Sequence, residues 1–208
     1  KNKDSAALLS NLQKNQELKS ILLEETPWVL ATKTEEQQKK NLAILFDLYR
    51  MNAELNSAYE KLKQAQQENG GFAWFSGGPD DRYMTQYILA GIGHLKKLNA
   101  IPASQSQKLK AITVEAILYL DSKIKQDYDQ LVKNKSDLKK YNPDNTIVQY
   151  FYMRSFFPEY KISVKSQTAH NYFMSRLPLS WTKQSVYMKG MIALVLHRKG
   201  DTKNAQAI

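Results

Sequence analysis

The sequence contains no cysteine among its 208 residues. This absence excludes a disulfide, a thiolate nucleophile and a thiolate metal site within these residues. Long apolar runs are also missing, because the longest, residues 191–196, is far shorter than the roughly 20 residues that span a bilayer. We therefore predict no transmembrane segment in the chain. No apolar stretch follows Lys1, so no signal peptide is visible either.

Arginine is scarce, with five residues in a chain whose net charge is +10. The lysines that supply this charge are scattered along the sequence, and neither an arginine-rich arm nor a recognition motif accompanies them. We expect a solvated, lysine-rich surface and no nucleic-acid partner. The hydrophobic content of 42% suits one globular domain over residues 1–208. Because the chain begins without Met and ends within a helical pattern, we expect it to be a fragment of a larger protein.

No segment shows the alternation of apolar and polar residues that is typical of a strand, so the predicted fold class is all-α. Apolar residues recur instead at helical spacing. The expected helices cover about residues 5–23, 34–49, 52–68, 82–98, 104–132, 142–157, 164–176 and 182–199.

Capping signals mark where several of these helices begin and end. Capping boxes stand at 34–37 and 104–107, Asp80 precedes the helix that starts at Arg82, and Asn142 precedes a proline. Pro27 and Pro158 interrupt helical patterns. We expect Gly200 to terminate the last long helix and Asp201 to cap a further one.

The helices are arranged as successive hairpins of similar length. Residues 87–93 and 187–193 share aromatic, apolar and small residues at matching steps, which supports a stacked arrangement. Such stacking predicts an α-solenoid or a closed α/α toroid, and we expect a partial or slightly truncated toroid.

A loop rich in glycine and aromatic residues connects two of the helices. It holds four of the eight glycines and three bulky aromatics, and it lacks the lysine and the preceding strand of a phosphate-binding loop. We interpret it as a packed corner, in which glycines shape the turn and aromatics anchor it in the core. The glycines are Gly70, Gly71, Gly77 and Gly78, and the aromatics are Phe72, Trp74 and Phe75.

The sequence contains few candidate catalytic or metal-binding residues. His94, His170 and His197 lack the spacing of a zinc motif, so we predict no metal site, and we predict no cofactor. Asp80 and Asp81 are better explained as residues at a helix N-terminus than as an acid and base, since adjacent aspartates do not by themselves span a glycosidic bond.

Two alternatives stay open at this point. One is a carbohydrate-active α/α toroid enzyme that uses Asp80, Asp81 or Glu68 beside Trp74 as a sugar platform. The other is a helical-repeat adaptor that binds a protein partner on an aromatic surface. That surface would include Tyr150, Tyr152 and Phe156.

Residues 69–75 (Asn-Gly-Gly-Phe-Ala-Trp-Phe), an acidic spacer and residues 83–89 (Tyr-Met-Thr-Gln-Tyr-Ile-Leu) resemble the thioester-domain region of bacterial alpha-2-macroglobulin-like proteins. In that family a glycine and aromatic loop leads into a helix with a Thr-x-Tyr motif. Segments 25–28, 187–194 and 197–200 add support, and the resemblance covers about residues 22–208. Its signature residues here are Gly70, Gly71, Phe72, Trp74, Phe75, Gly77, Gly78, Tyr83, Thr85 and Tyr87.

The resemblance implies an α/α toroid domain of a large periplasmic, cell-surface or secreted protease trap. Its partners would be neighbouring domains of the parent chain and, through the parent, proteases. The family's thioester joins a Cys and a Gln within a Cys-x-Glu-Gln motif, which is missing here, since Glu36-Gln37 belongs to the capping box at 34–37. The histidine that some members use for acyl transfer has no counterpart in residues 101–157. We therefore expect a noncatalytic domain that shields a thioester segment, and no enzyme.

Overall fold

A computed structural model describes residues 35–75 and 77–208 of the chain. The backbone contacts divide the chain into two compact units, residues 1–58 and 59–208. A single domain over residues 1–208 stays a prediction. Helices account for most of the described residues, which confirms the all-α fold class. The predicted helix at 5–23, the break at Pro27 and the capping box at Thr34 lie outside the described residues.

The first described helix, α4, runs without interruption over Glu35–Ala65. Two helices were predicted here, separated near Arg50, and this prediction is wrong. No glycine or proline occurs in this stretch, so nothing in the backbone interrupts the helical hydrogen bonds. Arg50 Nε also pairs with Glu54 Oε1 at 3.1 Å, an i,i+4 contact that spans the expected break.

The glycine and aromatic loop contains two very short strands, which the sequence did not predict. β1 (Phe72–Ala73) pairs with β2 (Asp80–Asp81) in antiparallel register, Phe72 opposite Asp81 and Ala73 opposite Asp80. Two residues are too few to display an alternating pattern, so the sequence carried no signal for them. The pairing closes the loop and places its end at the start of α5.

The other helices belong to the unit 59–208. Their bounds are α5 Arg82–Lys97, α6 Ala103–Lys133, α7 Asn145–Arg154, α8 Val164–Ser180, the 3₁₀ turn η1 Trp181–Lys183, α9 Val186–Arg198 and α10 Thr202–Ala207.

Two predicted helix starts are wrong, by one to three residues. The capping box at Ser104 does not form, because α6 already begins at Ala103 after Pro102 and has no side-chain cap. The cap of α7 is Asp144, whose Oδ1 accepts a hydrogen bond from Ile147 N at 2.9 Å, and not Asn142.

The later helix ends also differ from prediction. α7 ends at Arg154, four residues before Pro158, so the proline does not stop it. α8 continues past Arg176 to Ser180 and includes Pro178 in its last turn, where only one hydrogen bond is lost. The predicted helix at 182–199 is a 3₁₀ turn followed by α9. Gly200, with φ of +86°, and Asp201, which caps α10 through Asn204 N, agree with prediction.

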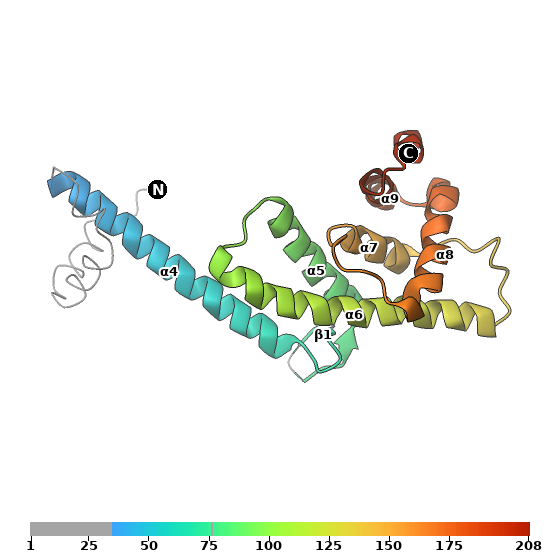
Figure 1. Cartoon of the computed structure of the whole chain (residues 1–208), viewed down its shortest axis with the longest axis horizontal. Helices are drawn as coiled ribbons and strands as arrows, with labels where there is room; N and C mark the ends of the chain where they lie inside the picture. The colour runs from blue at the N-terminus through green and yellow to red at the C-terminus, as the bar shows by residue number, and fades with distance from the viewer. Residues whose placement is uncertain (1–34, 76) are drawn as a thin grey trace. The chain divides into compact units, whose positions relative to one another are not determined.

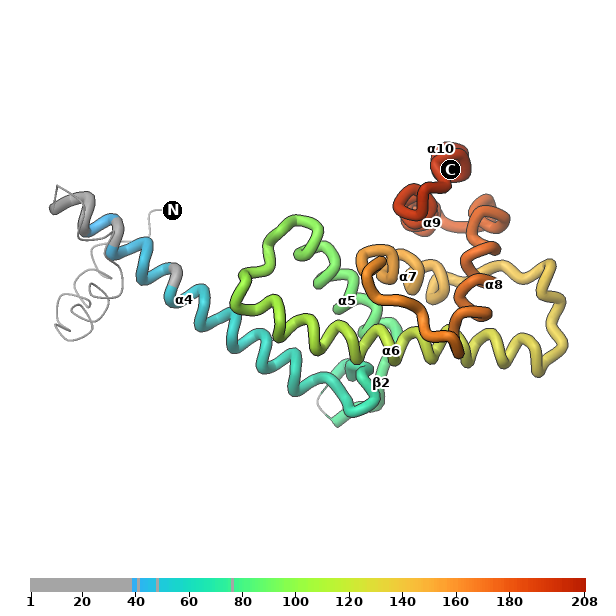
Figure 2. The backbone as a smooth tube through the Cα atoms, viewed as in Figure 1, coloured from blue at the N-terminus to red at the C-terminus, as the bar shows by residue number. Residues whose placement is uncertain are grey.

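The helices of the unit 59–208 pack in two rows. α5 packs against α7 and α7 against α9, while α6 packs against α8. Figure 1 shows α5 and α7 on the same side of the long helix α6, and the backbone trace in Figure 2 ends in α10 beside α9. The core between the rows is fully buried and strongly aromatic. Its largest side chains include Phe72, Leu89, Leu120, Tyr150, Phe151, Phe157 and Phe173.

Candidate functional site

The predicted signature loop begins with a close backbone contact. Gly70 has φ of +88°, and a Cβ on it would lie 2.3 Å from the backbone oxygen of Glu115 in α6. Gln66 Nε2 donates to Gly70 O and to Ile112 O, which ties the end of α4 to the same part of α6. Glycine at this position is therefore required by both conformation and space.

Phe72 anchors the loop, as predicted, and is completely buried. Its N–H donates to Thr85 Oγ1 at 2.9 Å, and Thr85 Oγ1 donates to Asp81 O at 2.7 Å. Thr85 is itself fully buried. The threonine of the Thr-x-Tyr motif thus joins the loop to the first turn of α5.

Trp74 and Phe75 do not anchor the loop, which corrects the prediction. Their side chains are 61% and 68% exposed. β1 ends at Ala73, so both residues lie on the part of the loop that leaves the core before β2 returns to it. Gly77 and Gly78 follow before β2, and a Cβ on Gly78 would lie 3.0 Å from the Phe75 ring.

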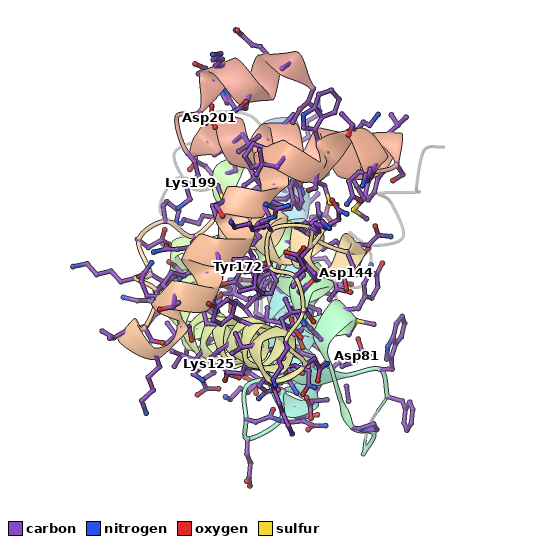
Figure 3. All side chains as sticks on the ribbon, turned by 90° about the vertical axis from the view of Figure 1, so that its right-hand side faces the viewer. Asp81, Lys125, Asp144, Tyr172, Lys199 and Asp201 are labelled. Atoms are coloured by element: carbon purple, nitrogen blue, oxygen red, sulfur yellow. The ribbon has the colours of Figure 1, made fainter. Side chains whose placement is uncertain are left out.

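The two adjacent aspartates have separate structural roles. The N-cap of α5 is Asp81, one residue later than predicted, with its Oδ1 accepting a hydrogen bond from Met84 N at 2.7 Å. Figure 3 shows Asp81, Asp144 and Asp201, each at the start of a different helix. These positions match the general preference for Asp at helix N-termini.

Asp80 is held by α6 instead. Its Oδ2 accepts a hydrogen bond from Tyr119 Oη at 2.5 Å and lies 3.3 Å from Lys123 Nζ. The Tyr119 hydrogen bond and the Lys123 charge lower the pKa of Asp80, and burial opposes them. Burial and the neighbouring Asp80 raise the pKa of Tyr119, so its hydroxyl keeps the proton. A carboxyl that ionises this readily is poorly suited to serve as a general acid.

The three histidines lie apart. His94 Nε2 is 2.9 Å from Tyr152 Oη, His170 is buried against the Phe151 ring, and His197 is exposed near the end of α9. Across residues 35–75 and 77–208 no group of three His, Asp or Glu side chains could hold a metal ion. Among the same residues no helix is both long and apolar enough to cross a membrane.

A ladder of exposed aromatic rings connects the loop to α5. The Trp74 ring stacks on Tyr83 at a centroid distance of 6.3 Å, and Tyr83 stacks on Tyr87 at 6.4 Å. All three side chains are largely exposed. Tyr83 and Tyr87 are spaced by one helical turn, so Trp74, Tyr83 and Tyr87 form one continuous aromatic surface.

A groove of about 380 Å³ continues this surface over α5, α7 and α9. Tyr87 and Tyr187, which occupy matching positions of the proposed internal repeat, both line it. Of the adaptor surface predicted from the sequence, only Tyr152 lines the groove, whereas Tyr150 and Phe156 are buried in the core. Tyr152 is half-buried, and its ring packs edge-on against the Phe156 ring at a centroid distance of 5.3 Å.

Gln86, which also lines this groove, was not predicted as a site residue. It is 2% exposed, and neither its amide oxygen nor its amide nitrogen has a hydrogen-bond partner among the described residues. A buried amide without partners costs about 1–3 kcal/mol. The signal that could have pointed to Gln86 is its position next to Thr85, between Tyr83 and Tyr87 on the same helix.

Compared with protein-family models, with curated proteins and with solved structures, the chain matches none. The functional interpretation therefore depends on the residues described above.

Proposed function

We propose that this chain is a noncatalytic helical domain of an alpha-2-macroglobulin-like, protease-trapping inhibitor. In this role it docks against neighbouring domains of the parent protein and shields a thioester segment supplied by the parent. The location would be periplasmic, at the cell surface or secreted. The observation that carries the proposal is the aromatic ladder of Trp74, Tyr83 and Tyr87, which belongs to the resembling segment and is left uncovered.

Uncovered aromatic rings in such a continuous group favour an interaction surface. Isolated exposed apolar residues are ordinary, but contiguous ones mark places where another surface packs. Tyrosine and tryptophan are also enriched at interfaces, since they combine a large apolar area with a polar group. The groove beside the ladder is lined by aromatic and neutral polar groups, which suits a protein surface.

The two-row packing supports the finer fold prediction of an α/α toroid. In a toroid the helices alternate between an inner and an outer ring, and here α5, α7 and α9 form one row while α6 and α8 pack together in the other. We infer that these hairpins form a partial or slightly truncated toroid.

We assign no catalysis to the chain. The sequence holds no cysteine for a thioester. Asp81 caps a helix, and Asp80 is bound by Tyr119 and Lys123, so neither is placed to perform acid–base chemistry on a sugar. Loss of glycan hydrolysis in an Asp80→Asn/Asp81→Asn variant would support the carbohydrate-active alternative instead.

A helical-repeat adaptor is the second candidate, favoured by the groove with its unpaired Gln86 amide. An amide can both donate to and accept from the backbone of a bound peptide. Tight binding of a separate protein by the isolated chain, without any parent domains, would favour this function.

The direct test uses the parent protein and an active protease. A trap leaves the protease able to cleave a small chromogenic peptide while protecting a large protein substrate. We expect the Tyr87→Ala parent to lose part of this protection, because Tyr87 is 67% exposed on the ladder. Tyr49→Ala is the matched control, since Tyr49 is equally exposed on α4. Equal inhibition of small and large substrates would contradict trapping.

A further inference from the structure

A second cavity, of about 370 Å³, lies away from the aromatic groove. Its walls come from the end of α7, the connection from α7 to α8, the first half of α8 and the end of α9. This volume falls in the range of small-molecule pockets. Only basic side chains supply formal charge to the lining, which contains no aspartate or glutamate. The basic residues are Arg154, Lys161, Arg198 and Lys199, joined by His170.

Arg154 is already committed to the structure. Its Nε donates to Asp121 Oδ1 at 3.2 Å, its Nη1 to Phe157 O and its Nη2 to Tyr160 O. Asp121 balances its charge from behind the cavity wall. Each of its three nitrogens thus donates to a protein oxygen, and Arg154 positions the connection that carries Lys161.

Three other cations face the cavity without such compensation. Neither Lys161 nor Lys199 forms an ion pair with a carboxylate in the described part of the chain. Arg198 donates to Ser155 Oγ at 2.7 Å and lies 4.0 Å from the centre of the Phe156 ring, and neither partner is charged. The cavity is therefore a concentration of positive charge, and positive charge in a recess attracts anions.

His170 supplies an unpaired polar atom. Its side chain is 6% exposed, lines the cavity, and has no hydrogen-bond partner for Nδ1 among the described residues. The Phe151 and Tyr150 rings lie 5.0 and 6.3 Å from the imidazole, centre to centre. Burial, assisted by the charges of Lys199 and Arg154, lowers the pKa of His170 to about 4. The ring is therefore neutral at physiological pH, and an N–H on Nδ1 would be a buried donor in need of an acceptor.

We propose that this cavity binds a phosphate-class oxyanion, held by Lys161, Arg198 and Lys199 and by a hydrogen bond from His170 Nδ1. The anion supplies the acceptors that these donors lack, and charge-assisted hydrogen bonds are the strongest that such groups form. The shared chemistry is the phosphate group, either as free phosphate or at the end of a larger phosphomonoester. The site is independent of the docking surface, because the groove and the cavity share no lining residue.

Binding of the anion must also affect His170. Besides burial, Lys199 after α9 and Arg154 on α7 lower the pKa of its imidazole, and a side-chain hydrogen bond with Asn171, beside it on α8, raises it. An anion next to the ring offsets the two cations and favours the protonated imidazole, so its pKa should rise on binding. By linkage, a phosphate of fixed charge should bind the protonated ring more tightly than the neutral ring.

The test is a titration of the whole chain with inorganic phosphate at constant ionic strength. Calorimetry measures the binding, and the NMR signals of the His170 ring report its pKa. We expect saturable binding, and a rise of about 1 in the pKa of His170. Lys161→Gln and Lys199→Gln should each weaken binding about tenfold, the value of one charge-assisted contact. Lys165→Gln removes the same charge from an exposed position on α8 outside the lining, and should leave the affinity unchanged.

Glycerol phosphate in place of phosphate separates the two sources of the ligand. Tighter binding of the ester indicates that the remaining volume receives the attached group, whereas equal binding indicates a site for the free anion. The proposal is overturned if the pKa of His170 does not respond to phosphate, or if all three lysine variants weaken binding equally. Protease trapping by the parent protein would be unaffected by either result, so the two proposals can fail separately.

Discussion

Gly70→Ala should be among the most destabilising single-methyl additions in the chain. The substitution adds a Cβ that would lie 2.3 Å from Glu115 O and 2.6 Å from Glu115 C. Both are backbone atoms within α6, so they cannot rotate away as the end of a flexible side chain could. The loop would have to move off α6, which would strain the bonds from Gln66 Nε2 to Gly70 O and Ile112 O.

Two separable effects add to the cost of this substitution. The φ of +88° places alanine in the left-handed region, at roughly 1–2 kcal/mol. A gain of about 0.4–1 kcal/mol from the stiffer unfolded chain offsets part of this. Overpacking against a rigid wall adds about 1–3 kcal/mol. We expect a total loss of about 3 kcal/mol in the free energy of unfolding.

Gly200→Ala provides the matched control. Gly200 has nearly the same φ, +86°, but nothing lies within 4 Å of the position its Cβ would take. Only the conformational cost applies there, so its loss should be about 1 kcal/mol.

Urea denaturation followed by circular dichroism measures both variants. The difference of about 2 kcal/mol corresponds to roughly 4–8 °C in melting temperature for a chain of this size. Equal losses for the two variants would refute the close approach of the loop to α6. A larger loss at Gly200 would refute the assignment of Gly70 as the tight position.

Three further predictions concern polar groups. Thr85→Val leaves the buried Phe72 N–H without its acceptor and should cost about 1–3 kcal/mol in urea denaturation, whereas Thr113→Val, which removes only a bond to Leu109 O within α6, should cost less. Tyr119→Phe removes the hydrogen bond that lowers the pKa of Asp80, so carbon NMR of the carboxyl should show that pKa rising; an unchanged value would contradict the contact. The folded pKa of His170, about 4, lies below its ordinary 6.5, so acidification protonates the unfolded chain first and stability falls. From pH 7 to about pH 5 this loss should be about 2 kcal/mol, and it should disappear in His170→Asn.

The sequence predicted the helices well because their apolar spacing is a local property. It failed at junctions where tertiary contacts decide between neighbouring residues of the same kind. Asp80 and Asp81 are equally good caps by type, but Tyr119 and Lys123 on α6 bind Asp80, and Asp81 is left to cap α5. Residues 119 and 123 are about 40 positions away, so no local pattern could have separated the two aspartates.

The candidate sites show the same difference between local features, which the sequence predicts, and tertiary contacts, which it does not. The Thr-x-Tyr motif and the loop before it were visible in the sequence. The structure joins them through the buried Thr85 hydrogen bonds and through the exposed ring ladder. The sequence did not show which aromatic residues are buried. Phe72 and Trp74 are only two positions apart, yet Phe72 is buried and Trp74 is exposed. β1 determines this outcome: it holds Phe72 under α5 and ends before Trp74.

The basic cavity could not be predicted from patterns in the sequence. Its cations come from three segments that the fold brings together, and in the sequence Lys161, Arg198 and Lys199 are indistinguishable from the solvated lysines and arginines around them. The fold distinguishes them by their lack of an ion pair, because Asp121 pairs with Arg154 and, among residues 35–75 and 77–208, no carboxylate pairs with the other three. A chain with a net charge of +10 can spread that charge over its surface at little cost. Gathering part of it around the recess that His170 lines raises the local positive potential there, which favours an anion in the space between.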